Sequence, residues 1–114
     1  MKRLIVNADD FGMAPEVNEA VERANREGVL RSASLMVGAP AAADAIERAQ
    51  RLTALAVGLH VVLVNGRPVL PAERLPDLVD ERGEFLSDLV RAGVRFFAIA
   101  SPFATRVYDR CHSF

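Results

Sequence analysis

The stretch Leu4–Gly12, LIVNADDFG, decides the fold of this chain. It opens with three apolar residues, Leu4–Val6, and continues with a pair of acids, Asp9 and Asp10. A short continuous apolar run is typical of a strand whose two faces are both covered, as in a parallel sheet. We therefore predict a buried strand over residues 4–6, with the two aspartates just beyond its carboxyl end.

A rhythm of strand and then helix continues from this stretch. Pro15 suits the first turn of a helix, and Gly28 suits its end. Further apolar runs over residues 33–37 and 55–64 predict two more strands, with a second helix between them. The two predicted helical stripes are Val17, Ala20, Val21 and Ala24, and Ala42, Ala45, Ile46 and Ala49. This alternation indicates an α/β fold with right-handed crossovers and a parallel sheet.

The alternation of strand and helix weakens from Asn65 onward, where one glycine and three prolines predict a long loop: Gly66, Pro68, Pro71 and Pro76. Short helical pieces are expected over residues 75–79 and 85–90. The last seventeen residues, 98–114, show no helical stripe and no further strand-helix unit, so we expect them to form a divergent tail.

Composition excludes several classes of protein. The 114 residues carry 14 basic and 15 acidic side chains, and a net charge of −1 gives no electrostatic reason to bind nucleic acid. The apolar runs are far shorter than the roughly 20 residues that a membrane-spanning helix needs. The single cysteine, Cys111, allows no internal disulfide, and the start of the chain has no signal-peptide core. We therefore expect a cytoplasmic protein.

The acidic pair and one histidine are the candidate site. Asp9 and Asp10 follow the first predicted strand, and His60 lies toward the end of the third. The carboxyl ends of parallel strands gather on one side of a sheet, so the three side chains are expected to approach one another. Neighbouring carboxylates repel each other, and a divalent metal is a common way to hold them together. Two structural alternatives stay open, a capping or turn role for the acids and a buried core role for the histidine.

A response-regulator receiver domain also carries paired acids after its first strand. Such a domain needs an aspartate at the end of the third strand and a lysine at the end of the fifth. The third run here offers His60 in place of an aspartate, and the only lysine is Lys2. These residues exclude the receiver interpretation.

Several motifs together resemble the YdjC-like carbohydrate deacetylases. They are the opening stretch Leu4–Gly12, Val17-Asn18 with Ala20, the strand Ser32–Val37, and Val57-Gly58-Leu59-His60. The segments Gly66–Pro71 and Arg91–Phe97 are most similar to the hopanoid-biosynthesis-associated branch, HpnK. The resemblance covers residues 1–97, which we therefore expect to be the N-terminal portion of the deacetylase domain, with residues 98–114 as a tail that is out of frame.

The resemblance implies a fold and a chemistry. Family members have a (β/α) TIM-barrel-like fold and remove N-acetyl groups from amino sugars with a divalent metal, commonly Mg²⁺. By position, Asp9 would be the general base, and Asp10 and His60 would be metal ligands. A ligand set that includes an imidazole also suits Zn²⁺ or Mn²⁺. In the HpnK branch the substrate would be an N-acetylglucosaminyl hopanoid.

The chain departs from the family pattern in its length. A full barrel needs about 250 residues, and three strands cannot close one. The family's second metal-binding histidine comes from a later motif that is absent here. His112, beside Cys111, is interpreted as part of a solvated tail rather than as a replacement metal ligand. We therefore expect an incomplete barrel from a truncated chain. It is either a deacetylase or a non-catalytic fragment that binds metal weakly and self-associates through exposed sheet edges.

Overall fold

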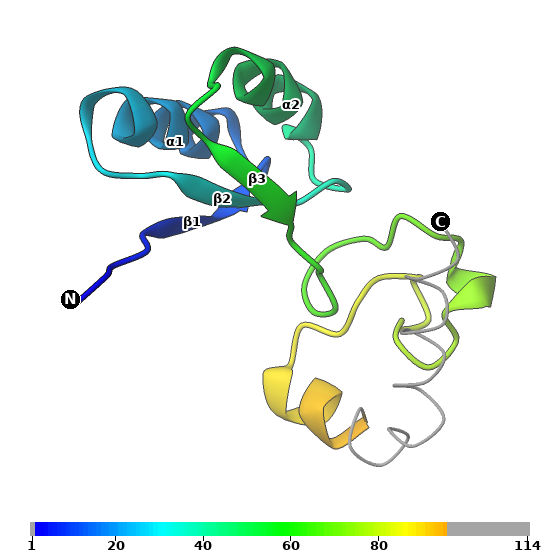
Figure 1. Cartoon of the computed structure of the whole chain (residues 1–114). Coiled ribbons are helices and arrows are strands. Elements are labelled where there is room, and N and C mark those ends of the chain that lie inside the picture. The colour runs from blue at the N-terminus through cyan, green and yellow to red at the C-terminus, as the bar shows by residue number, and fades with distance from the viewer. Residues whose placement is uncertain (1, 96–114) are drawn as a thin grey trace. The chain divides into compact units, whose positions relative to one another are not determined.

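The computed structural model describes residues 2–95, and these fall into two compact units that divide between Val61 and Val62. The first unit is a three-stranded parallel sheet in the order β1-β2-β3 with two helices (Figure 1). Its elements are β1 (Asn7–Phe11), α1 (Pro15–Glu27), β2 (Ser32–Leu35), α2 (Ala42–Arg51) and β3 (Ala56–Leu59). The predicted α/β class and parallel pairing are confirmed.

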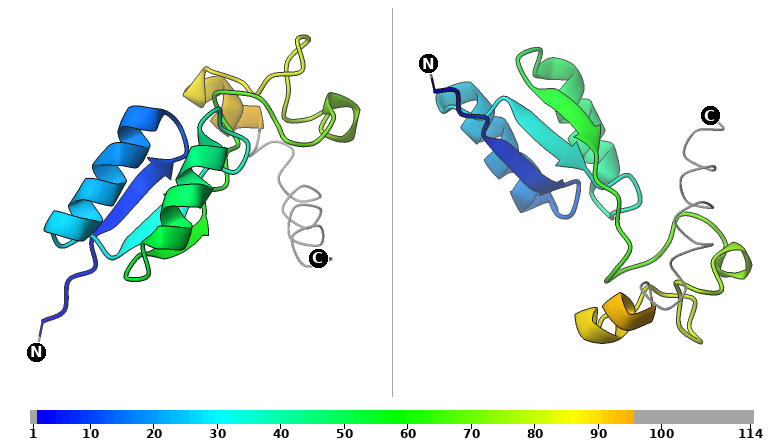
Figure 2. Two further views of the ribbon diagram at one scale, coloured as in Figure 1. Left: turned by 90° about the horizontal axis from the view of Figure 1, so that it is seen from above. Right: turned by 60° about the horizontal axis from the view of Figure 1, so that its bottom comes forward.

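Both helices lie on the same face of the sheet (Figure 2). Between the helices and that face lies the core of the unit, in which Phe11 and Ala45 are completely buried. The other buried members of this core are Val21, Leu30, Ala33, Leu52 and Leu55. The opposite face of the sheet is covered by no helix or strand of the first unit, so the sheet is open rather than closed into a barrel.

The first strand begins later than the apolar run predicts. Leu4 and Ile5 are 87% and 85% exposed, and the pairing of β1 with β2 starts only at Asn7, opposite Ser32. The prediction of a buried strand over residues 4–6 is therefore wrong. The reason is that no partner strand lies beside the residues before Asn7. The neighbouring strand, β2, begins only at Ser32, immediately after the turn that follows α1.

The third strand is also less buried than predicted. All four residues of β3 are exposed, including the apolar Val57 and Leu59. An apolar run predicts a buried strand only if other strands lie on both sides of it. β3 is an edge strand of this sheet and has a neighbour on one side.

Helix α1 begins at Pro15 and ends before Gly28, as predicted, but its buried face differs from the predicted apolar stripe. Its buried residues are Asn18, Val21 and Asn25, whereas Ala20 and Ala24 are exposed. The two asparagines are buried because each makes hydrogen bonds there: the Asn25 side-chain amide, for example, donates to the Leu30 carbonyl oxygen over 2.8 Å. A pattern of apolar residues alone does not detect such positions. In α2, Ala42 and Ala45 are buried as expected, and Ile46 is exposed.

The second unit contains little regular structure. It has a short 3₁₀ helix, η1 (Ala72–Arg74), an antiparallel bridge between Val79 and Phe85, and a small core of Leu78, Val79 and Phe85. A helix starts at residue 89, later than predicted, because the Asp88 carboxylate caps it by accepting hydrogen bonds from the amides of Val90 (2.9 Å) and Arg91 (3.1 Å). The predicted helix over residues 75–79 is wrong: it would contain Pro76, and the residue before a proline disfavours the helical conformation.

None of the helices within residues 2–95 is both long and apolar enough to span a membrane. The predicted tail, with Cys111 and His112, lies outside the described residues.

Candidate active site

A bulge in β1 presents the two acidic residues. Ala8 pairs with Ala33 of β2, and Phe11 pairs with Leu35. Asp9 and Asp10 therefore lie together opposite the single residue Ser34. Asp10 has a φ of 60°, in the left-handed region that few residues other than glycine and asparagine or aspartate adopt. Bulges of this kind bend a strand and redirect a side chain, and they are frequent beside active sites.

His60 reaches the acidic pair from the end of β3. Its backbone amide donates to the carbonyl oxygen of Leu35 over 2.9 Å, which continues the pairing of β2 and β3 by one residue. Its Nδ1 atom lies 3.8 Å from Oδ1 of Asp10 and accepts a hydrogen bond from the Asp10 amide over 3.3 Å. The Asp10 side chain is 53% exposed and that of His60 is 26% exposed, so both are open to a ligand from solvent.

The carboxylate of Asp9 is held by two neutral donors. Its Oδ1 atom accepts hydrogen bonds from Nδ2 of Asn7 over 2.9 Å and from the hydroxyl of Ser34 over 2.8 Å. The Ser34 oxygen also lies 3.3 Å from Nδ1 of His60. A continuous polar chain therefore crosses all three strands at the carboxyl edge of the sheet.

The sheet face that carries this chain is small and polar. Residues paired across parallel strands share a face, and Asn7 pairs with Ser32, which in turn pairs with Ala56. Ser34 pairs with Gly58 in the same way. With no bulky apolar side chain in these positions, the face opposite the helices does not have the composition of a second hydrophobic core.

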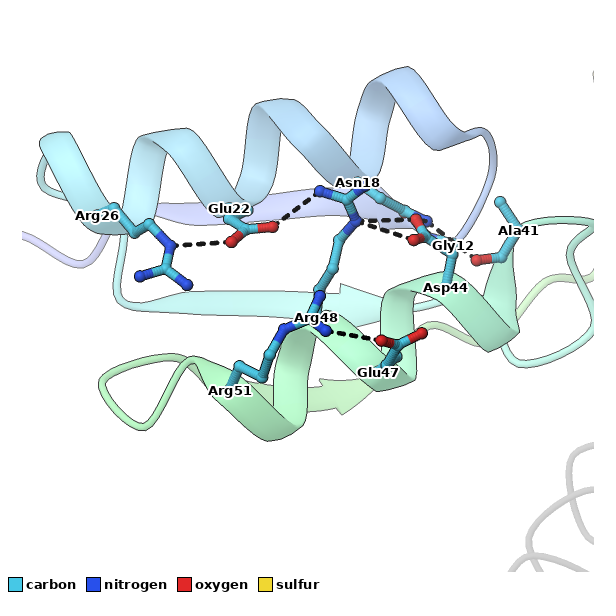
Figure 3. Close-up of polar contacts among 9 residues, drawn as sticks. All are labelled: Gly12, Asn18, Glu22, Arg26, Ala41, Asp44, Glu47, Arg48 and Arg51. Atoms are coloured by element: carbon cyan, nitrogen blue, oxygen red, sulfur yellow. Dashed lines mark hydrogen bonds and ion pairs between the residues drawn. The ribbon is translucent and has the colours of Figure 1, made fainter.

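Asn18 fixes the turn that follows the acidic pair (Figure 3). Its side chain is completely buried; its Oδ1 accepts a 2.7 Å hydrogen bond from the Gly12 amide, and its Nδ2 donates to the carbonyl oxygen of Ala41 and to Asp44. Gly12 has a φ of +100°, and a Cβ there would lie 3.1 Å from the Met36 carbonyl oxygen. The turn therefore requires both a glycine and the asparagine beneath it.

A charged network ties α1 to α2 next to Asn18 (Figure 3). Arg48 of α2 contacts Glu22 of α1 over 2.8 Å and Asp44 over 2.9 Å. The hydrogen bond from Asn18, followed by that from Arg48, lowers the pKa of Asp44 below its usual value. The pKa of Glu22 is lowered in the same direction, first by its hydrogen bond to Arg26. The contacts of Glu22 with Arg48 and of Asp44 with Asn18 join the two helices.

The described residues supply two of the ligands that a metal ion would need. Asp10 offers a carboxylate oxygen and His60 an imidazole nitrogen, a donor set that suits Zn²⁺ or Mn²⁺ and that Mg²⁺ also accepts in part. Within residues 2–95, however, there is no group of three or more His, Cys, Asp or Glu side chains arranged to hold a metal ion. The two side chains are of the types that ligate divalent metals, but Nδ1 of His60 accepts the Asp10 amide hydrogen here, so a cation at that nitrogen would displace this hydrogen bond.

The three residues expected from the sequence, Asp9, Asp10 and His60, thus lie together, and their chemical roles stay predictions. Sequence reasoning missed Asn7 and Ser34. The signal for them was the alternation of small polar residues along β1 and β2, which a search for apolar runs ignores. The role of Asn18 had no such signal, because it depends on a turn and a helix far apart in the sequence.

The sequence is similar to proteins of a known family. The pattern of the family described as YdjC-like protein matches residues 3–110. A carbohydrate deacetylase of Thermoanaerobacter pseudethanolicus is 44% identical over 85 residues, which are 75% of this chain and 34% of that protein. A carbohydrate deacetylase of Vibrio cholerae is 45% identical over 83 residues, which are 73% of this chain and 32% of that protein. The chain spans about a third of the length of the curated relatives it matches.

A solved structure shares the fold. The crystal structure of an Enterococcus faecalis protein, described as a candidate cellobiose-phosphate cleavage protein, is similar with a TM-score of 0.67 and 39% sequence identity. The similarity covers 72% of this chain and 33% of that one, so the open sheet with its crossover helices corresponds to part of a larger α/β structure. Because the family pattern covers nearly the whole sequence, the chain belongs to the YdjC-like protein family.

Proposed function

We propose that this chain carries the part of a metal-dependent N-deacetylase that holds the catalytic base and two metal ligands. The observation that supports the proposal most directly is the convergence of Asp9 and Asp10 of β1 with His60 at the end of β3, with Nδ1 of His60 3.8 Å from Oδ1 of Asp10. The carbohydrate deacetylases among its relatives support the class of reaction.

In the proposed reaction, Asp10 and His60 hold a divalent cation, and Asp9 acts as the base. The cation, when bound, polarises the acetyl carbonyl and makes the attacking water more acidic. Asp9 takes a proton from that water as the water oxygen bonds to the carbonyl carbon. It then returns the proton to the amide nitrogen as the C–N bond breaks, and the products are acetate and the free amino sugar.

The geometry of Asp9 supports its assignment as the base. Within residues 2–95 its carboxylate accepts hydrogen bonds from Asn7 and Ser34 and forms no ion pair with Lys or Arg, and it lies one residue from a proposed metal ligand. A base oriented by neutral donors on a rigid strand keeps its capacity to accept a proton.

We propose an amino sugar as the substrate, and within that class an N-acetylglucosaminyl hopanoid. The support for the lipid-linked substrate is the resemblance of Gly66–Pro71 and Arg91–Phe97 to the HpnK branch. For the metal we propose Mg²⁺, with Mn²⁺ and Zn²⁺ as the alternatives that the imidazole ligand favours.

A second candidate is a non-catalytic chain that binds metal weakly or associates with another chain. It is favoured by the shortage of ligands, since residues 2–95 contain no group of three or more metal-binding side chains. Acetate release from an N-acetylglucosaminyl oligosaccharide and from an N-acetylglucosaminyl hopanoid, measured with Mg²⁺, Mn²⁺ or Zn²⁺, separates the two. Release that the Asp9→Asn variant abolishes establishes the deacetylase; no release from either substrate, by any assembly seen in size-exclusion chromatography, leaves the non-catalytic function.

A further inference from the structure

We propose that Ser34 is the positioning residue of Asp9: its hydroxyl fixes one oxygen of the carboxylate and leaves Oδ2 of Asp9 as the atom that takes the proton. The inference rests on the function proposed above and adds a residue and an atom to it. Its basis is the position of the Ser34 hydroxyl, 2.8 Å from Oδ1 of Asp9 and 3.3 Å from Nδ1 of His60.

The direction of each hydrogen bond follows from the number of hydrogens and lone pairs that each group carries. The amide hydrogen of Asp10 has a fixed direction and points at Nδ1 of His60, so this nitrogen carries a lone pair and the proton of the neutral ring is on Nε2. A serine hydroxyl has one hydrogen to donate, and a charged carboxylate is a stronger acceptor than a neutral imidazole nitrogen. Ser34 therefore donates to Asp9.

This arrangement distinguishes the two oxygens of Asp9. Among the described residues, the hydrogen bonds from the side chains of Asn7 and Ser34 both go to Oδ1. The two hydrogen bonds to Oδ1 therefore orient the carboxylate, and Oδ2 is the oxygen that accepts a proton from the attacking water. A base with one anchored and one free oxygen loses little orientation when it takes the proton.

The backbone of Ser34 is well suited to such a role. It lies in the central strand, opposite the bulge of β1 on one side and paired with Gly58 of β3 on the other. A Cβ placed on Gly58 would meet no atom within 4 Å, so the space on this side of the serine is open to a ligand. A hydroxyl on a strand held from both edges positions its partners more firmly than one on a loop.

The test uses NMR on the whole metal-free chain with four sequences: wild type, Ser34→Ala, Ser34→Thr and Ser32→Ala. Ser32 is the matched control, because it lies on the same strand and face but donates its hydroxyl to the Val6 carbonyl oxygen. The readout is the ¹³Cγ resonance of Asp9. We expect Ser34→Ala to shift it, Ser34→Thr to restore it, and Ser32→Ala to leave it at its wild-type position.

A calorimetric titration with Mn²⁺ is the second measurement. Ser34 donates to Asp9 and not to a proposed metal ligand, so Ser34→Ala is expected to bind Mn²⁺ as tightly as Ser32→Ala does. If the Asp9 resonance in Ser34→Ala matches that in Ser32→Ala, the positioning role is overturned. If the wild-type chain binds no Mn²⁺, the metal part of the proposed function fails instead, while the Asp9 resonance still decides the role of Ser34.

Discussion

Nδ1 of His60 accepts a hydrogen bond from the backbone amide of Asp10, although 50 positions separate the two residues in the sequence. The contact joins the end of β3 to the bulge of β1 across the central strand, and it brings the imidazole to within 3.8 Å of the Asp10 carboxylate. One backbone hydrogen bond thus aligns two side chains that a shared cation would bridge.

The first prediction concerns that cation. Asp10→Ala and His60→Ala are each expected to weaken Mn²⁺ binding by at least about tenfold, and the double variant by less than the product of the two losses, because both side chains act on one ion. Isothermal titration calorimetry on the three variants measures this. Glu47→Ala removes an exposed carboxylate of α2 and is the control. Losses that multiply independently would show that the two residues do not share a metal ion.

The second prediction concerns the conformation of Asp10. Its φ of 60° costs less for glycine than for alanine, so Asp10→Gly is expected to exceed Asp10→Ala in free energy of unfolding by about 1 kcal/mol. Both variants lose the carboxylate, and both are expected to lose metal affinity to the same extent. Urea denaturation followed by circular dichroism compares them. Equal stability would mean that the bulge relaxes once the carboxylate is gone.

A third prediction follows from the burial of Asn18. Asn18→Ala leaves the Gly12 amide without its buried acceptor, at an expected cost of about 2–3 kcal/mol in the free energy of unfolding. Asn18→Asp is expected to be destabilised as well, because it would place a second carboxylate against Asp44. The added substitution Asp44→Asn is expected to recover part of that loss. Amide hydrogen exchange at Gly12 gives the local readout, and unchanged protection in Asn18→Ala would contradict the assignment.

The fourth prediction is made for two glycines. Gly12→Ala combines a φ of +100° with a Cβ that would contact the Met36 carbonyl oxygen at 3.1 Å and the Leu35 side chain at 3.2 Å. We expect it to lower the free energy of unfolding by more than about 1 kcal/mol. Gly58→Ala, where a Cβ meets nothing within 4 Å, is the matched control and is expected to change stability by less than that. Similar urea midpoints for the two variants would contradict this reading of the turn.

The fifth prediction is a dependence of stability on pH. Asp44 and Glu22 have lowered pKa values in the folded chain, through Asn18 and Arg26 respectively as the largest causes. Groups of this kind add stability above their unfolded pKa values of about 4, and that contribution is lost as the pH falls through the folded values. The free energy of unfolding is therefore expected to be level above about pH 5 and to decline below about pH 4.

Two variants test the source of this decline. In Asp44→Asn and in Glu22→Gln one of the shifted groups no longer titrates, so the loss of stability toward low pH should be shallower in each than in the wild type. Urea midpoints measured between pH 3 and pH 7 give the comparison. A wild-type slope in both variants would assign acid sensitivity to other carboxylates.

The sequence was sufficient for the fold class and for the expectation that Asp9, Asp10 and His60 lie close together. Alternating strand and helix patterns predicted the parallel sheet, because crossover connections between parallel strands have few alternatives. The rule that the carboxyl ends of such strands share one edge was enough to group Asp9, Asp10 and His60. Their chemical roles are matters for the experiments above.

Local features were harder to read from the sequence. The first strand was placed at Leu4–Val6, but it runs from Asn7 to Phe11, because a strand exists only where a partner strand provides hydrogen bonds. The buried face of α1 was also missed, since Asn18 and Asn25 are buried for their hydrogen bonds and not for their hydrophobicity.

What the sequence by itself determined is therefore the order of the elements and which residues gather at one edge of the sheet, because both follow from local patterning and the handedness of crossovers. Only the tertiary structure decided the bulge at Asp9 and Asp10, the serine hydroxyl that donates to Asp9, and the asparagine beneath Gly12. Each of these depends on hydrogen bonds between groups that are distant in the chain, and their geometry exists only after the strands have paired.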